Sequence, residues 1–345
     1  MINLPSKSKG ITHVGPYPPL SFREGDIWFD TANNRLLLAS QDYYLFSIVL
    51  SGFGHVCGGV NGSNFISTIE CYSFVFDSGN SKVVGNLGES LAYTGANDSR
   101  LCGYVCGGTN GTVHVNNIRR FTSYFHSGPS TSVSSLGASI SGVSANNSST
   151  YGYIYGGVDG SNNNYNTIRR FQFSNDSSGA SSLSATLSSS RRYTCANNSS
   201  GHGYVCGGYT SDKVNVVDIL NFSNNSVSTR SNVLTSSKHA AAANNSSIYG
   251  HVCGGTGSYS YGDIFQFPFD SGNASPGAIL SPSVYFLCAN EGNFYGYTYS
   301  GYTGSVYVSR ISKVIFGISR AMASVVGNIS SQKSGTSANN YNSFY

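Results

Sequence analysis

The residues best suited to bind a metal or to react covalently are eight cysteines and seven histidines. Half of the cysteines share one position of a repeated motif, which tyrosine occupies in two further copies. The residues at this position are Cys57, Cys106, Tyr155, Cys206, Cys253 and Tyr299. A metal ligand does not alternate with an aromatic ring in this way, and equivalent positions of separate repeats are expected to lie beyond the ~7 Å between Cα atoms that a disulfide spans. We therefore favour small buried thiols, with Cys195 and Cys206 placed as neighbours across a hairpin and Cys102 and Cys106 as local neighbours.

Catalytic patterns are equally scarce. No two histidines have metal-ligand spacing, and His55 and His251 stand where the motif usually carries tyrosine, which indicates a structural position. The chain has no Gly-x-Ser-x-Gly elbow. Its acidic residues number only 15, and those in turns such as 76–80 are turn formers rather than the paired carboxylates of a glycosidase. We expect no catalytic residue, no metal and no cofactor.

The low charge excludes further classes. Charged residues make up 10% of the chain, the net charge is +4, and no run of Lys and Arg exceeds two, so there is no electrostatic footprint for nucleic acid or acidic lipid. Apolar runs such as 45–50 are far shorter than the roughly 18 residues that span a bilayer. The first residues lack the apolar core of a signal peptide, so we expect synthesis in a host cytoplasm without secretion.

One motif recurs through most of the chain. It reads GHVCGG, GYVCGG, GYIYGG, GYVCGG, GHVCGG and a degraded GYTYSG, and its penultimate residues are 58, 107, 156, 207, 254 and 300, with steps of 49, 49, 51, 47 and 46. An Ala-Asn pair lies 11 residues before this marker in five copies, which predicts a tight hairpin of fixed length. An isoleucine follows the marker by 10 to 12 residues, usually with an aromatic residue three positions later. These isoleucines are Ile69, Ile118, Ile168, Ile219, Ile264 and Ile311.

Each repeat is predicted to form four short antiparallel strands, and four strands every 46 to 51 residues are typical of a β-propeller blade. The C-terminal stretch contains Ala338-Asn339, 49 residues after Ala289-Asn290, but no Gly-Gly strand follows it. The first Gly-Gly strand, conversely, has no Ala-Asn strand before it. We therefore predict an all-β fold, a six-bladed propeller over residues 51–345 whose last strand completes the first blade and removes the open sheet edges.

Three pairs of adjacent arginines interrupt this uncharged sequence: Arg119-Arg120, Arg169-Arg170 and Arg191-Arg192. Neighbouring side chains of a strand face opposite ways. We expect one member of each pair to lie at a blade interface and the other in solvent, and we prefer this structural role to a ligand contact.

The hydrophobic strand that ends in Gly-Gly resembles kelch-like propellers, over about residues 51–345. The Tyr and Trp that usually follow in kelch blades are replaced here by Ile-x-x-aromatic, and the only tryptophan, Trp28, lies outside the repeats. The resemblance therefore implies the architecture and no particular activity.

Residues 1–50 carry a second resemblance. The stretch GDIWFDTANNRLLL at 25–38 is similar to the GDxWxDTxxNxL hairpin of bacteriophage tail-fibre and virion appendage proteins. The resemblance implies a short extended arm with a β-hairpin that docks on another virion protein or trimerises, with Trp28, Phe29 and Asp30 as anchoring residues. The alternative is that Trp28 and Phe29 cap one end of the propeller.

Ligand recognition is expected in the variable loops that follow Gly-Gly. In a propeller such loops gather on one face, and tyrosine, asparagine, serine and glycine make adaptable recognition surfaces. Tyrosine rings stack on sugars and asparagine amides both donate and accept hydrogen bonds, although plain solubilising loops have a similar composition. The candidate ligand-binding residues are Asn110, His114, Asn163, Asn164, Tyr165, Tyr209, Tyr259, Tyr261 and Tyr302.

The hypothesis that these features favour is a non-enzymatic virion appendage, a phage tail fibre or receptor-binding protein on the surface of the particle. Its partners would be other virion proteins at the arm and a host-surface glycan or protein at the propeller, with homo-oligomers, trimers foremost, and with neither nucleic acid nor membrane insertion. The alternatives are a capsid or tail decoration protein without a receptor and an enzyme that acts on surface polysaccharide.

Overall fold

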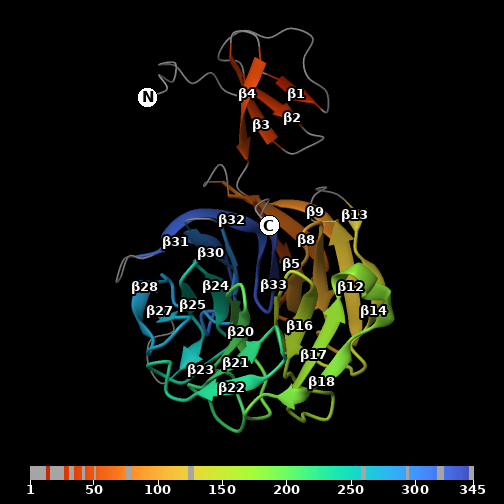
Figure 1. The fold of residues 1–345 in the computed structure, drawn as a ribbon, viewed down its shortest axis with the longest axis vertical. Coiled ribbons are helices and arrows are strands. Elements are labelled where there is room, and N and C mark those ends of the chain that lie inside the picture. Colours follow the sequence, from red (N-terminus) through yellow and green to blue (C-terminus); the bar gives the residue numbers. More distant parts are fainter. Residues whose placement is uncertain are drawn as a thin grey trace. The chain divides into compact units, whose positions relative to one another are not determined.

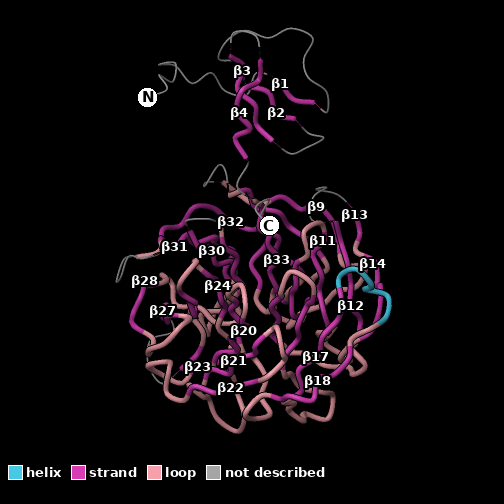
Figure 2. The backbone as a smooth tube through the Cα atoms, in the orientation of Figure 1, coloured by secondary structure: helices cyan, strands magenta, loops and turns pink. Residues whose placement is uncertain are grey.

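The computed structural model describes residues 13–15, 27–30, 35–40, 43–49, 52–74, 79–122, 128–257, 262–292, 295–316 and 322–341. Its contacts divide the chain into two compact units, Met1–Gly52 and Phe53–Ser343. Strands dominate both units, and one short 3-10 helix, η1 (Phe173–Ser178), is the only helix among the described residues (Figure 2). None of these residues belongs to a helix long and apolar enough to cross a membrane.

The N-terminal unit contains one four-stranded sheet. Strands β2 (Ile27–Asp30) and β3 (Arg35–Ser40) are antiparallel, so the structure contains the hairpin predicted from residues 25–38. Strand β1 (His13–Gly15) pairs parallel with β2, and β4 (Tyr43–Val49) pairs antiparallel with β3. The hairpin is therefore the middle of a small sheet.

Six sheets arranged as blades form the propeller, and each has four antiparallel strands, given in order from the innermost outwards. Blade 1 is β33 (Ser337–Tyr341), β5 (Phe53–Cys57), β8 (Thr68–Ser73) and β9 (Lys82–Asn86), with β13 (Gly128–Pro129) added in parallel. Blade 2 is β10 (Gly95–Asp98), β11 (Cys102–Cys106), β12 (Asn117–Thr122) and β14 (Thr131–Ser135). Blade 3 is β15 (Ser144–Asn147), β16 (Tyr151–Tyr155), β17 (Thr167–Gln172) and β18 (Ser181–Thr186).

The other three blades repeat this order. Blade 4 is β19 (Cys195–Asn198), β20 (His202–Cys206), β21 (Val217–Asn221) and β22 (Val227–Arg230). Blade 5 is β24 (Ala242–Asn245), β25 (Tyr249–Cys253), β27 (Asp263–Pro268) and β28 (Ser275–Ile279). Blade 6 is β29 (Cys288–Glu291), β30 (Tyr295–Tyr299), β31 (Val308–Ile315) and β32 (Ser324–Lys333). Two short ribbons, β6 (Val60–Asn61) with β7 (Asn64–Phe65) and β23 (Lys238–His239) with β26 (Thr256–Gly257), extend loops.

The C-terminal strand closes the ring. Strand β33 pairs with β5 from Ser337 opposite Cys57 to Tyr341 opposite Phe53, although these strands come from opposite ends of the propeller sequence (Figure 1). Every innermost strand also contacts the innermost strands of both neighbouring blades. The predicted six-bladed propeller, completed by its last strand, is confirmed.

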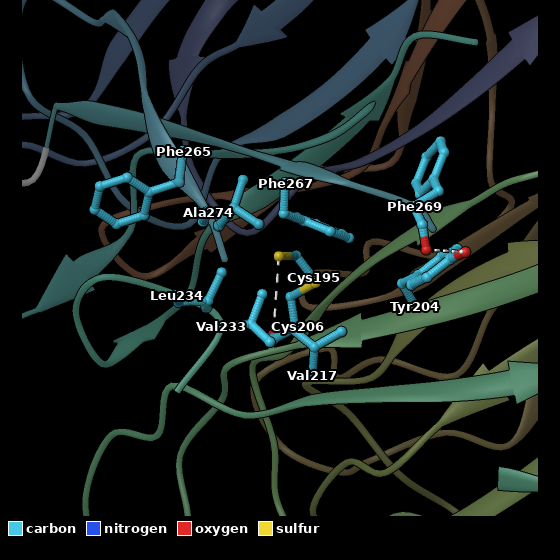
Figure 3. Packing of buried hydrophobic residues seen from close by; sticks show 11 residues of the cluster. Cys195, Tyr204, Cys206, Val217, Val233, Leu234, Phe265, Phe267, Phe269 and Ala274 are labelled. Carbon is cyan, nitrogen blue, oxygen red and sulfur yellow. Dashed lines mark hydrogen bonds between the residues drawn. The ribbon is translucent and has the colours of Figure 1, made fainter. Parts of the chain in front are cut away.

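The hydrophobic core lies between blades rather than within them. Six clusters of buried side chains each combine residues of two neighbouring blades, including blade 6 with blade 1. In the cluster of blades 4 and 5, Phe267 of β27 and Phe269 just after it pack toward Tyr204 and Cys206 of β20 (Figure 3). A blade therefore buries its apolar faces only when both neighbours are present.

The register corrects one sequence assignment. In blade 2, Cys106 lies opposite Ile118, whereas in blade 4 the equivalent Cys206 lies opposite Val217. The position predicted for Ile219 thus belongs to Val217, which is fully buried while Ile219 is half-buried. The sequence pattern did not show this register, because valine replaces the usual isoleucine at 217. Leu220, three residues later, replaces the usual aromatic residue.

The Gly-Gly turn docks each blade on the next. The N–H of its second residue donates to a main-chain oxygen just before the next innermost strand in all six blades. The pairs are Gly59–Leu91, Gly108–Ile140, Gly157–Arg191, Gly208–Lys238, Gly255–Val284 and Gly301–Lys333, at 2.8 to 3.0 Å. The first glycine must be left-handed and close to this carbonyl: at Gly156, φ is 59° and an added Cβ would lie 2.3 Å from the oxygen of Arg191.

The asparagine of the Ala-Asn pair joins neighbouring blades at their inner edge. This side chain is at most 3% exposed in every blade. In five blades its Nδ2 donates to the main-chain oxygen of the equivalent asparagine in the following blade, at 2.6 to 3.0 Å. The donors are Asn97, Asn146, Asn197, Asn290 and Asn339.

In blades 1 to 4 the cysteine or tyrosine of the Gly-Gly strand donates a hydrogen bond to this asparagine, which explains why the two residue types exchange there. The thiol of Cys106 donates to Oδ1 of Asn97 at 3.5 Å, and the hydroxyl of Tyr155 donates to Oδ1 of Asn146 at 2.7 Å. Both side chains thus supply the donor that orients the amide. All eight cysteines are described, and none of them forms a disulfide. Cys195 lies opposite Cys206, as predicted, whereas Cys102 and Cys106 are not neighbours, because they lie four residues apart along β11.

One arginine of each pair is the more deeply buried, as predicted, but of the other three only Arg120 is exposed to solvent. In blade 2, the Arg119 side chain is 12% exposed and pairs with Glu89 at 2.9 Å, whereas the Arg120 side chain is 43% exposed and pairs with Asp176. In blade 3, Arg169 is buried and Arg170 half-buried. Arg191 is fully buried and pairs with Asp218 at 2.9 Å, whereas Arg192 is half-buried.

Candidate ligand-binding face

One end of the propeller gathers all six Gly-Gly loops. The residue after each Gly-Gly turn is bridged to the residue five positions before the buried asparagine. These bridges join Val60 to Ser334, Thr109 to Ala92, Val158 to Ser141, Tyr209 to Arg192, Thr256 to His239 and Tyr302 to Tyr285. We call this end, where the innermost strands begin, the loop face.

A ring of six left-handed residues surrounds the axis at the loop face. Its members are Tyr93, Gly142, Tyr193, Ala240, Phe286 and Gly335, with φ between 54° and 64°. Each N–H donates to the carbonyl oxygen of the member in the preceding blade, at 2.7 or 2.8 Å, and the N–H of Tyr93 closes the circuit on Gly335. Because all six main-chain donors are used, the ring fixes where the side chains of its members project.

Aromatic and small residues alternate around this ring. The rings of Tyr93, Tyr193 and Phe286 contact one another edge to face, with centroids 5.0 to 5.8 Å apart. The intervening positions must be small: an added Cβ on Gly142 would lie 2.9 Å from the ring of Tyr193, and one on Gly335 would lie 2.8 Å from that of Tyr93. The three aromatic rings therefore pack over the axis of the propeller.

A narrow cavity of about 130 Å³ follows the axis below these rings. The alanine of the Ala-Asn pair lines it in all six blades: Ala96, Ala145, Ala196, Ala243, Ala289 and Ala338. The aromatic rings, rather than this alanine-lined space, offer the chemistry for recognising a ligand.

Beyond the buried asparagines, toward the other end, the innermost strands carry a ring of amides and acids. Its members are Asp98, Asn147, Asn198, Asn245, Glu291 and Asn340, and adjacent members share hydrogen bonds such as Asp98 N–H to Asn147 Oδ1 at 3.0 Å. Burial raises the pKa of Asp98 to about 7, and the nearby Glu291 adds to this shift. Burial also raises the pKa of Glu291 to about 7.

This ring gives a prediction for Asp98→Asn. The folded-state pKa of Asp98 lies above its unfolded value, so ionisation of this carboxyl lowers the free energy of unfolding as the pH rises from about 4 to 7. Above pH 7 the whole of this loss remains. Asparagine already occupies this position in four blades and carries no such charge. We expect Asp98→Asn to raise the free energy of unfolding by about 1–3 kcal/mol at pH 8 and to have little effect at pH 4.

Urea unfolding of both chains at pH 4, 6 and 8 measures this difference. His239 and His251, whose pKa values burial lowers to about 4, contribute the opposite slope, but they are common to both chains and cancel in the comparison. A stability difference that does not grow with pH would show that the carboxylate is not the destabilising group.

Aromatic rings continue from the centre of the loop face toward blades 4 and 6. The ring centroid of Tyr209 lies 5.3 Å from that of His239, and the ring centroid of His239 lies 6.4 Å from that of Tyr193. On the other side, Phe286 lies 5.4 Å from Tyr285, and Tyr302 lies between Tyr285 at 5.5 Å and Tyr307 at 4.8 Å. We call this set the aromatic arc: Tyr209, His239, Tyr193, Tyr93, Phe286, Tyr285, Tyr302 and Tyr307. All of its members are half-buried and so keep part of their surface in contact with solvent.

The structure brings several predicted residues together. Tyr209 and Tyr302 belong to the aromatic arc. Asn164 joins the loops of blades 3 and 4, because its Nδ2 donates to the oxygen of Thr210 at 3.1 Å. His114 joins blades 2 and 3 through a contact of 3.0 Å between Nδ1 and the oxygen of Val158.

Other predicted residues use their polar groups within their own loops or on a neighbouring loop. The amide of Asn163 and the hydroxyl of Tyr165 both donate to Asp159, at 3.1 and 3.0 Å. Asn110 accepts two main-chain N–H groups and donates to Glu89 at 3.2 Å. These groups stabilise loop conformations and leave less for a ligand.

The remaining predicted residues fall partly or wholly outside the described part of the chain. Tyr259 and Tyr261 lie outside the described residues. Trp28, Phe29 and Asp30 belong to the main chain of β2, and their side chains lie outside the description.

Sequence reasoning missed the centre of the face. Tyr93, Tyr193 and Phe286 precede the buried asparagine by four residues in alternate blades, and Arg192 and His239 precede it by five. The sequence shows the fixed spacing of these residues from the asparagine. It does not show the ring of left-handed residues that turns them toward the axis.

No known protein family matches the chain, and no curated protein is significantly similar to it.

Proposed function

We propose that the chain is a virion appendage, a bacteriophage tail fibre or receptor-binding protein, in which a kelch-like propeller binds a glycan or protein of the host surface. The observation that carries this proposal is the aromatic arc, in which eight partly exposed rings gather on one face around the axis. Few charged side chains lie among them, so recognition would depend on ring stacking and on hydrogen bonds from neighbouring amides.

Residues 1–50 would attach the propeller to other virion proteins and assemble it as a homo-oligomer, a trimer in the simplest case. The motif GDIWFDTANNRLLL and its β2–β3 hairpin support this role. Particles propagated with a gene that lacks codons 1–50 are expected to omit the protein. Normal incorporation would contradict an anchoring role for the arm.

Receptor binding is tested with the labelled full chain on a panel of bacterial strains, with and without purified surface polysaccharide as competitor. We expect saturable binding to some strains and a loss of at least tenfold in affinity for Tyr209→Ala combined with Tyr302→Ala. Tyr249→Ala is the matched control, because Tyr249 is also half-buried but lies at the hairpin end of blade 5, opposite the loop face. Absence of binding to every strain would contradict the proposal and favour a decoration protein, and release of reducing ends would indicate an enzyme.

A further inference from the structure

The loop face holds one arginine that is surrounded by rings and lacks an acidic partner. The guanidinium of Arg192 lies 5.5 Å from the ring centre of Tyr193 and 5.4 Å from that of Tyr209. One of its nitrogens donates to Oδ1 of Asn162. Within the described part of the chain it forms no ion pair, and its buried Nε has no hydrogen-bond partner.

Three other arginines of the described part of the chain contrast with Arg192. Arg119, Arg120 and Arg191 each pair with a carboxylate at 2.9 Å. Their charges are thus used to hold the fold together. The charge of Arg192 is not, and it lies at the mouth of the propeller beside rings that keep solvent-exposed surface.

A second cation, Lys213, acts on the same histidine of the loop face as Arg192. Lys213 is bridged through its main chain to Tyr209, on the loop of blade 4. Burial lowers the pKa of His239 to about 4, and Lys213 and Arg192 contribute to this shift, whereas Asp212 opposes it. His239 is therefore neutral above pH 5, and the two cations outnumber the single acid that acts on it.

We propose that Arg192, Tyr193, Tyr209 and His239 form a subsite for a pyranose that carries a carboxylate, such as a hexuronate or a sialate. The guanidinium offers paired N–H donors that match the two oxygens of a carboxylate, a geometry that a lysine lacks. The adjacent tyrosine rings offer flat surfaces for the C–H face of the sugar, and the exposed amide of Asn162 lies beside the guanidinium for its hydroxyls. This inference rests on the proposed glycan-binding function and narrows its ligand class to acidic sugars.

The experiment measures binding of the full chain to oligogalacturonate and oligosialate by biolayer interferometry. Oligogalacturonate whose carboxyl groups have been reduced to alcohols is the neutral counterpart with the same backbone. We expect binding of at least one acidic probe. Arg192→Ala is expected to weaken binding of the acidic probe at least tenfold. If oligogalacturonate binds, reduction of its carboxyl groups is expected to weaken its binding at least tenfold as well. Arg192→Lys keeps the charge but not the paired donors and should recover only part of the affinity.

Arg100→Ala is the matched control, since it removes the same charge from an exposed arginine in the hairpin at the opposite end of β10. The carboxylate subsite is overturned if neither acidic probe binds, if the reduced probe binds equally well, or if Arg192→Ala and Arg100→Ala behave alike. Cell binding judges the broader proposal separately. Cells bound through Tyr209 and Tyr302 without any effect of Arg192→Ala would overturn only the subsite, and absence of cell binding would overturn the receptor function itself.

Discussion

A chain that ends at Lys333 is expected to lose its cooperative fold. The truncation removes β33 and so takes the innermost strand from blade 1, together with three residues that bond neighbouring blades around the axis, Gly335, Asn339 and Asn340. It also exposes the inner edge of β5, including Val56 and Cys57, which are completely buried in the closed ring. The expected loss is comparable to the whole free energy of unfolding of an ordinary domain, about 5–15 kcal/mol.

Circular dichroism during heating and size-exclusion chromatography test this expectation. The truncated chain should show no sharp thermal transition and should associate through the open strand edge. A synthetic peptide of residues 334–345 added in trans should restore the transition. The same peptide with Asn339→Leu should restore it poorly, because it lacks the amide that donates to the oxygens of Asn97 and Tyr104. A truncated chain that melts like the full chain would show that closure does not hold the propeller together.

Much of the propeller architecture was predictable, because each copy of the sequence motif makes the same contacts. Two motif residues have a partner in the next blade: the second glycine donates to a carbonyl oxygen there, and the asparagine donates to a main-chain oxygen. The cysteine or tyrosine donates to the asparagine of its own blade. A residue with such a contact must recur in every blade, so blade number, strand order and closure could be read from the spacing. Blade 4 was assigned wrongly at Ile219, because Val217 and Leu220 fill the same buried space with different side chains.

The recognition surface was less predictable because its residues vary between blades. Asn163 and Tyr165 have the composition of a binding loop, but their polar groups hold Asp159. The rings of Tyr93, Tyr193 and Phe286 come together only because six left-handed residues close a hydrogen-bonded circuit around the axis. Such a circuit depends on all six blades at once, so no single repeat predicts it.

Gly156→Ala is expected to destabilise the propeller more than the same substitution at Gly62 or Gly160. Alanine at a φ of 59° costs about 1 kcal/mol, because its Cβ crowds the carbonyl oxygen that follows. The Cβ would also lie 2.3 Å from the oxygen of Arg191, which accepts the N–H of Gly157 and cannot retreat without separating blades 3 and 4. We expect a total loss of about 3 kcal/mol, measured by urea unfolding.

The other two glycines separate the causes. Gly62 has a similar φ of 60° but nothing within 4 Å of an added Cβ, so Gly62→Ala should cost only the backbone contribution of about 1 kcal/mol. Gly160 has neither restriction, and Gly160→Ala should change stability by less than about 0.5 kcal/mol. If Gly156→Ala and Gly62→Ala cost the same, the close approach of blades 3 and 4 contributes nothing. The Gly-Gly motif would then recur for its backbone conformation alone. A larger loss for Gly156→Ala would mean that this motif recurs because it sets the distance between neighbouring blades, which in turn sets how closely the rings of the loop face can gather.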